Sequence, residues 1–211
     1  MSDAPAFDAG FRERLAELFA WRRDVRRFRT DPVDPALVDT LIETASLAPS
    51  VGLSQPWRFV TVDTPARRAA IRAAFADSNA AALAAQPDAR AAAYAALKLA
   101  GLDAAPVHIA VLVEPDPAQG HGLGRTTMPE TVGYSAVLAI HTLWLAARAA
   151  GLGLGWVSIL EPERVCAILD VPADWRLVGY LCLGWPAAET VTPELETAGW
   201  EHRRPASVVR R

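Results

Sequence analysis

The sequence contains little cysteine and carries no surplus of positive charge. Its 211 residues include two cysteines, and 24 acidic against 21 basic side chains give a net charge of −3. This balance argues against a general nucleic-acid-binding protein, because such proteins usually have a basic surplus. Cys166 and Cys182 lie in apolar stretches without metal-ligand spacing. We therefore expect two buried, reduced thiols in a cytoplasmic protein.

Patterns typical of several other functions are also missing. The four histidines are far apart in the sequence, so no metal site is expected. His141, on an apolar stretch, is expected to be a hydrogen-bonded core residue. Two glycine-rich stretches, 120–124 and 151–155, do not follow the strand–glycine–helix order that a dinucleotide site requires. We interpret the first as a mobile loop and the second as the C-cap of a helix.

The longest apolar stretch, residues 131–150, does not indicate a membrane protein. His141 and Arg148 interrupt it, and it barely reaches the ~20 residues that a membrane span needs. We expect a central helix buried in the core or by a partner subunit. Residues 1–10 lack a basic start followed by an apolar run, so we expect a disordered tail and no secretory signal.

The composition predicts a single α+β domain over residues 1–211. Apolar residues make up 52% and charged residues 21% of the chain, and there is no repeat or linker. Hydrophobic periodicity and capping residues predict helices at residues 11–21, 35–47, 65–75, 88–102, 131–150 and 162–169. It predicts strands at residues 57–63, 106–113, 154–159 and 175–184. The long loop 114–130, rich in glycine and proline, is expected to be an active-site lid.

The most informative segment is 21–28, which places four arginines and Asp24 between Trp21 and Phe28. A solvated basic patch is one interpretation, but the planar guanidinium groups suit a phosphate, and the aromatic residues fix the segment against a core. Residues 49–57 add hydroxyls, an amide and backbone N–H groups suited to a polar heterocycle. Together the two segments predict a site for a phosphorylated, aromatic cofactor.

Arg22-Arg23-x-Val25-Arg26, Ala48-Pro49-Ser50 and Gln55-Pro56-Trp57 resemble the FMN-binding nitroreductase family. The resemblance runs from about Phe11 to Arg204. It implies a central mixed β-sheet flanked by helices, in an interlocked homodimer that exchanges its C-terminal tails. FMN would lie in two sites at the subunit interface, with the loop 50–54 supplied by the partner subunit. The implied FMN-binding residues are Arg22, Arg23, Asp24, Val25, Arg26, Ser50, Gly52, Ser54, Ser158 and Arg203, with Arg204 as the alternative to Arg203.

The resemblance is closer to one branch of this family. Nitroreductases usually carry serine at the position of Asp24 and asparagine at that of Leu53. The stretches 22–26, 50–57, 124–131 and 155–159 instead resemble the branch that fragments reduced FMN with dioxygen. Its products are 5,6-dimethylbenzimidazole, the lower ligand of cobalamin, and D-erythrose 4-phosphate. The resemblance further implies a separate flavin reductase that supplies FMNH2, because the closed lid would leave no room for a nicotinamide.

The same resemblance implies catalytic roles for Asp24 and Ser158. The arginines near Asp24 are expected to keep it ionised, which suits a general base. Asp24 could instead orient Arg22 or Arg26 through an ion pair, and Ser158 could bond the backbone at a strand end. For the whole protein, an NAD(P)H-dependent nitroreductase or flavin reductase and a non-catalytic flavin-binding protein remain the alternatives.

Overall fold

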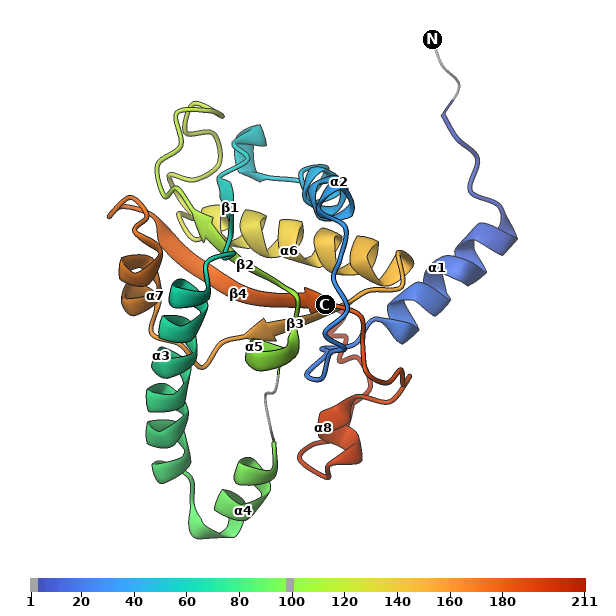
Figure 1. Ribbon diagram of the computed structural model, residues 1–211. Coiled ribbons are helices and arrows are strands. Elements are labelled where there is room, and N and C mark those ends of the chain that lie inside the picture. Colours follow the sequence, from blue (N-terminus) through green and yellow to red (C-terminus); the bar gives the residue numbers. More distant parts are fainter. Residues whose placement is uncertain (1–3, 98–100) are drawn as a thin grey trace.

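The computed structural model describes residues 4–97 and 101–211 (Figure 1). The α-helices are α1 (Ala9–Trp21), α2 (Pro35–Ala45), α3 (Pro65–Ala84), α4 (Asp88–Ala96), α5 (Gly101–Ala104), α6 (Thr131–Ala149), α7 (Pro162–Leu169) and α8 (Glu194–Thr197). The strands are β1 (Trp57–Thr61), β2 (Val107–Val113), β3 (Gly153–Val157) and β4 (Arg176–Gly184), and a short 3-10 helix, η1, spans Val51–Leu53. This is the expected α+β nitroreductase-like architecture.

The four strands form one sheet in the order β1-β2-β4-β3, and all neighbouring strands pair antiparallel. We expected a mixed sheet. In the described chain, parallel pairing is confined to a single bridge between Asp24 and Leu154 of β3. The reason is that the edge strand β3 takes the short arginine-rich segment, rather than a full strand, as its parallel neighbour.

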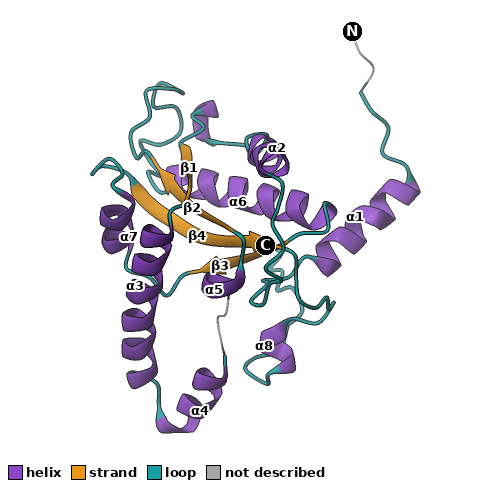
Figure 2. Ribbon diagram, in the orientation of Figure 1, coloured by secondary structure: helices purple, strands orange, loops and turns teal. Residues whose placement is uncertain are grey.

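Helices cover both faces of the sheet (Figure 2), as the apolar run of β2 requires. Side chains alternate along β2, so Ile109 and Val111 enter the core beneath α6 and α2. Ala110 and Leu112 enter the second core, which α3 and α7 cover. The prediction that residues 106–113 form a strand buried on both faces is confirmed.

Helix boundaries differ from the predictions at three places. Helix α1 begins at Ala9, because the Asp8 side chain caps it by accepting a hydrogen bond from the Phe11 N–H at 2.7 Å. Helix α3 continues to Ala84, beyond the expected end at residue 75. The single helix expected at 88–102 is divided into α4 and α5, and its residues 98–100 lie outside the described part of the chain.

Two helices present apolar side chains to the surface. Helix α1 projects from the side of the body (Figure 1), and its Phe11 and Phe19 are exposed. Helix α6 buries one face in the core, whereas Tyr134 and Leu138 on its other face are exposed. His141 lies on this exposed face, so the prediction of a core histidine is wrong. Among the described residues, no helix is both long and apolar enough to cross a membrane.

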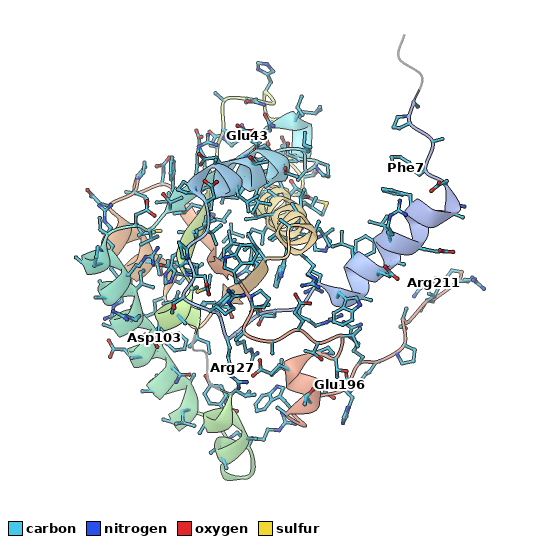
Figure 3. All side chains as sticks on the ribbon, turned by 45° about the vertical axis from the view of Figure 1, so that its right-hand side comes forward. Phe7, Arg27, Glu43, Asp103, Glu196 and Arg211 are labelled. Atoms are coloured by element: carbon cyan, nitrogen blue, oxygen red, sulfur yellow. The ribbon has the colours of Figure 1, made fainter. Side chains whose placement is uncertain are left out.

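The C-terminal segment after β4 returns to the arginine-rich segment. The Arg29 N–H donates to the Trp185 carbonyl at 2.8 Å, and the Ala187 N–H donates to the Arg27 carbonyl at 3.0 Å. Arg27, labelled near α8 in Figure 3, pairs with Glu194 of that helix at 3.2 Å. The last residues extend away from the body to Arg211 (Figure 3). Exchange of this tail between two subunits remains a prediction.

Candidate active site

The arginine-rich segment is attached to strand β3 by backbone contacts. The Val25 N–H donates to the Leu154 carbonyl at 3.0 Å, next to the bridge that Asp24 makes with the same residue. A Cβ atom on Gly155 would collide with the Val25 carbonyl, and one on Gly153 would lie 2.6 Å from the Val25 side chain. These two glycines therefore make room for the segment that carries Asp24.

The glycine-rich stretch 151–155 thus has two structural roles. Gly151, at φ 79°, donates to the Arg148 carbonyl at 3.0 Å, and Leu152 donates to the Ala147 carbonyl at 2.8 Å. This geometry ends α6, so the predicted helix C-cap is confirmed. The close approach of Val25 to Gly153 and Gly155 was not predicted, although glycine at alternate positions of a strand is a signal of close backbone contact.

The Asp24 carboxylate is held from two sides. Its Oδ1 accepts a hydrogen bond from the Trp156 N–H at 2.9 Å, and its Oδ2 lies 3.5 Å from Arg26 Nε. The side chain remains 37% exposed, so a ligand can reach it. Burial raises the pKa of Asp24 above its usual value, although the Trp156 hydrogen bond and the charges of Arg26 and Arg22 act to lower it. The loss of hydration thus outweighs the charges of the arginines in the direction of the shift, and the prediction that they keep Asp24 ionised stays a prediction.

Four guanidinium groups gather around one cavity beside Asp24. The cavity is lined by Arg22, Arg23, Asp24, Arg26, Pro193, Glu194, Leu195 and Arg203. The Nε atom of Arg23 is buried and has no hydrogen-bond partner among the described residues. Burial lowers the pKa of Arg23, and the positive charges of Arg203 and Arg22 lower it further. An anion would satisfy both the orphaned donor and the excess positive charge, as a phosphate does.

Asp24 also lines a second cavity. The charged residues of its lining are Arg23, Asp24, Arg26, Arg27, Arg148, Glu189 and Glu194, and apolar side chains come from Trp21, Trp144, Leu152, Leu154, Pro186 and Ala187. Asp24 therefore lines both a strongly cationic cavity and one whose exposed wall is mostly apolar. This arrangement fits a ligand that combines a phosphate with a flat aromatic ring.

The remaining predicted site residues lie in two other places. Ser158 directly follows β3, two residues after the Trp156 N–H that binds Asp24, and its side chain is exposed. The loop containing Ser50, Gly52 and Ser54 lies around η1, far from the arginine-rich segment (Figure 1). One chain therefore does not bring this loop to Asp24. The Ser54 Oγ atom is buried and has no hydrogen-bond partner among the described residues.

The predicted lid, residues 114–130, packs against this serine loop. Gln119 Nε2 donates to the Leu53 carbonyl at 2.6 Å and lies 3.2 Å from Gln55 Oε1. Gly120, at φ 83°, approaches so closely that a Cβ atom on it would lie 2.7 Å from the Gly52 carbonyl. The stretch interpreted as a mobile loop is therefore packed against other backbone, and Gln119 is a contact that sequence reasoning missed.

Comparison with known proteins assigns the chain to a family. The Nitroreductase family model matches residues 19–185, which include Asp24, the serine loop and Ser158. The chain belongs to the nitroreductase family. Within the described residues, no group of three or more histidine, cysteine, aspartate or glutamate side chains is arranged to hold a metal ion.

Two curated members of the nitroreductase family match this chain over nearly its whole length. It is 60% identical to 5,6-dimethylbenzimidazole synthase of Rhodospirillum rubrum, and the match covers 100% of both chains. It is 50% identical to the protein of the same name from Rhodobacter capsulatus, over 97% of this chain and 99% of the relative. The fold is also that of iodotyrosine deiodinase, whose crystal structure contains FMN and 3-iodo-L-tyrosine. That structure matches with a TM-score of 0.74 and 23% identity, over 93% of this chain and 97% of the other.

Proposed function

We propose that this protein is a 5,6-dimethylbenzimidazole synthase, an oxidoreductase that fragments reduced FMN with dioxygen. Two of the organic products would be 5,6-dimethylbenzimidazole, for the lower ligand of cobalamin, and D-erythrose 4-phosphate, and the pyrimidine ring of the flavin would leave as a third fragment. Two relatives of this name, at 60% and 50% identity, support the proposal. The structural observation that carries it is Asp24, an accessible carboxylate that lines both the arginine cavity and the apolar cavity. Flavin binding alone gives no reason for an acid at this position.

The residues of the two cavities fit FMN. Arg22, Arg23, Arg26 and Arg203 would hold its phosphate, and the apolar cavity beside Val25 would accept its ring. Ser50, Gly52 and Ser54 would complete the site from the partner subunit of a homodimer with exchanged tails. The distance of this loop from Asp24 within one chain supports that arrangement (Figure 1). We also propose a cytoplasmic location, where the free Cys166 and Cys182 would stay reduced.

Reduced FMN supplies both the electrons for dioxygen and the carbon atoms of the benzimidazole. The role that we assign to Asp24 is to accept protons and return them during fragmentation. Its position suits this role, because the carboxylate is accessible to a ligand and held by the Trp156 N–H, and a positioned carboxylate can transfer protons. The Trp156 N–H fixes Oδ1, and Ser158, two residues further along, would hydrogen-bond near the reacting edge of the ring. The loop 114–130 would exclude water, and a separate flavin reductase would supply FMNH2.

The test is aerobic incubation of the protein with pre-reduced FMN, followed by chromatography and mass spectrometry of the products. We expect 5,6-dimethylbenzimidazole from the wild type. The Asp24→Asn and Asp24→Ser variants should bind FMN and lose product formation by about 10²–10⁴-fold, the second because it restores the residue usual in nitroreductases. Recovery of only intact, oxidised FMN from the wild type would exclude the synthase.

An NAD(P)H-dependent nitroreductase or flavin reductase is the second candidate, and the family match favours it. In that case, NADPH added to the FMN-loaded protein without oxygen would rapidly bleach the flavin absorbance. Absence of bleaching counts against this candidate. A flavin-binding protein without catalysis is the third candidate, and turnover of either kind excludes it.

A further inference from the structure

Trp144 of α6 contacts two consecutive arginines of the proposed FMN site. Its indole Nε1–H donates a hydrogen bond to the Arg23 backbone carbonyl at 3.0 Å. The guanidinium carbon of Arg22 lies over the same indole, 4.9 Å from the ring centroid, which is cation–π geometry. A single side chain therefore holds the backbone of one arginine and the charged group of the other.

The same indole lies close to the groups that hold Asp24. It lines the apolar cavity together with Arg23 and Asp24. Its ring centroid is 6.5 Å from that of Trp156, whose backbone N–H binds the Asp24 carboxylate. The arginine-rich segment is thus fixed by the backbone of β3 on one side and by the α6 indole on the other.

The two supports act on different atoms. Strand β3 fixes the Val25 backbone and the Asp24 carboxylate through Leu154 and Trp156, but it does not orient either arginine side chain. In residues 4–97 and 101–211, no hydrogen bond or ion pair to the Arg22 guanidinium competes with its stacking on Trp144. Arginine loses considerable rotamer freedom when it binds a ligand, so a preset guanidinium binds an anion more tightly.

We propose that Trp144 is a positioning residue that presets Arg22 and Arg23 for the phosphate of FMN. This role rests on the proposed FMN site, because Trp144 would act on the phosphate only by holding Arg22 and Arg23. It predicts a selective effect, because loss of Trp144 should weaken recognition of the phosphate more than recognition of the ring system.

The experiment compares FMN with riboflavin, which has the same ring system and no phosphate. Trp144→Leu removes both contacts, whereas Trp144→Phe keeps an aromatic face for Arg22 and removes the N–H donor. Trp185→Phe is the matched control, because its Nε1–H also donates to a backbone carbonyl, that of Pro32 at 3.2 Å, outside the arginine cluster. Dissociation constants for oxidised FMN and riboflavin are measured by flavin fluorescence, with melting temperatures recorded for each variant.

We expect Trp144→Leu to lower the FMN-to-riboflavin affinity ratio about tenfold, from the loss of one charge-bearing contact and one hydrogen bond. The contact of Trp144 with the cavity for the ring is lost for both ligands and cancels in this ratio. Trp144→Phe should give a smaller loss of the same kind, and Trp185→Phe should leave the FMN-to-riboflavin ratio unchanged. Equal weakening of both ligands, or an unchanged ratio in both Trp144 variants, overturns the proposal.

The outcome for Trp144 can be separated from that for the synthase. A wild type that prefers FMN to riboflavin but forms no 5,6-dimethylbenzimidazole refutes the proposed function and leaves the Trp144 comparison valid. A wild type that forms the product, with Trp144 variants that keep the wild-type ratio, refutes the positioning role alone. If Trp144→Leu does not fold, Trp144→Phe decides, because it retains most of the side-chain volume.

Discussion

The backbone carbonyl of Val25 lies in the space that a side chain on Gly155 would need. This close contact allows the Val25 N–H to reach the Leu154 carbonyl and the Asp24 carboxylate to reach the Trp156 N–H. The position of the proposed catalytic acid therefore depends on a residue with no side chain, in the edge strand of the sheet.

Substitution of Gly155 by alanine should displace the arginine-rich segment. We expect Gly155→Ala to destabilise the fold by about 1–3 kcal/mol, the usual cost of overpacking, and to weaken FMN binding. Gly133→Ala is the control, because a Cβ atom at Gly133, inside α6, meets nothing within 4 Å. That variant should be neutral or stabilised by up to about 1 kcal/mol. Equal melting temperatures for the two variants would contradict the close contact.

Substitution of Asp24 by asparagine should separate catalysis from stability. Because burial raises the pKa of Asp24, the folded state holds this proton more tightly than the unfolded state does. The contribution of Asp24 to stability is therefore largest at acidic pH and is lost as the pH rises through the folded-state pKa. Asparagine carries no such penalty and keeps an acceptor for the Trp156 N–H.

At pH 7 we therefore expect apo Asp24→Asn to melt no lower than the wild type, while product formation falls by about 10²–10⁴-fold. Differential scanning fluorimetry and product assays on the same preparation measure both quantities. A clearly lower melting temperature would favour the alternative in which Asp24 mainly orients Arg26 through their ion pair.

The chemical identity of the site could be predicted from the sequence because it depends on charged side chains close together in the chain. Arg22, Arg23, Asp24 and Arg26 are adjacent in sequence and line one cavity, which Arg203 joins from the C-terminal segment. The buried strand at 107–113 was predictable for a similar reason, since an uninterrupted apolar run needs helices on both faces.

Properties that depend on tertiary approach could not be predicted in this way. The donor that fixes Asp24 is the backbone N–H of Trp156. Because nearly every residue has a backbone N–H, the sequence does not indicate which of them will bind a given carboxylate. The direction of the Asp24 pKa shift depends on how much water the fold removes, which the neighbouring arginines in the sequence do not show. That Asp24 is ionised stays a prediction. The indole of Trp144, which contacts Arg22 and Arg23, belongs to a helix that sequence analysis treated only as apolar.

The contact between the predicted lid and the serine loop should affect FMN binding. Leu53 and Gln55 both adopt positive φ angles, 55° and 41°, which residues other than glycine rarely do. The Gln119 amide supports this conformation through the Leu53 carbonyl and Gln55 Oε1. Gln119→Glu replaces the donor by a carboxylate beside two oxygen acceptors, so the loop should lose its support.

We expect Gln119→Glu to weaken FMN binding about three- to tenfold, as the loss of a neutral hydrogen bond would do. Gln86→Glu is the matched control, since Gln86 Nε2 also donates to a backbone carbonyl, that of Ala82, at the end of α3. FMN titrations of both variants provide the comparison. Similar affinities in the two would show that the serine loop keeps its conformation without Gln119.

Acid should destabilise the fold through His108. This side chain is 1% exposed, and its Nδ1 lies 3.0 Å from the Tyr180 hydroxyl. Burial, followed by the charge of Arg68, lowers the pKa of His108 to about 4. The unfolded chain, with a histidine pKa of about 6.5, therefore binds a proton more readily than the folded chain does.

The free energy of unfolding should consequently fall as the pH drops from about 6.5 to about 4, by roughly 3 kcal/mol over the full range from this group. Urea denaturation at several pH values in this window measures the slope. We expect His108→Gln to be less stable than the wild type at pH 7, because its fit against Tyr180 is poorer, but to lose less stability on acidification. The exposed His141 provides the control, and His141→Gln should keep the wild-type slope. If the plots of unfolding free energy against pH are parallel for His108→Gln and the wild type, a group other than His108 accounts for the loss of stability in acid.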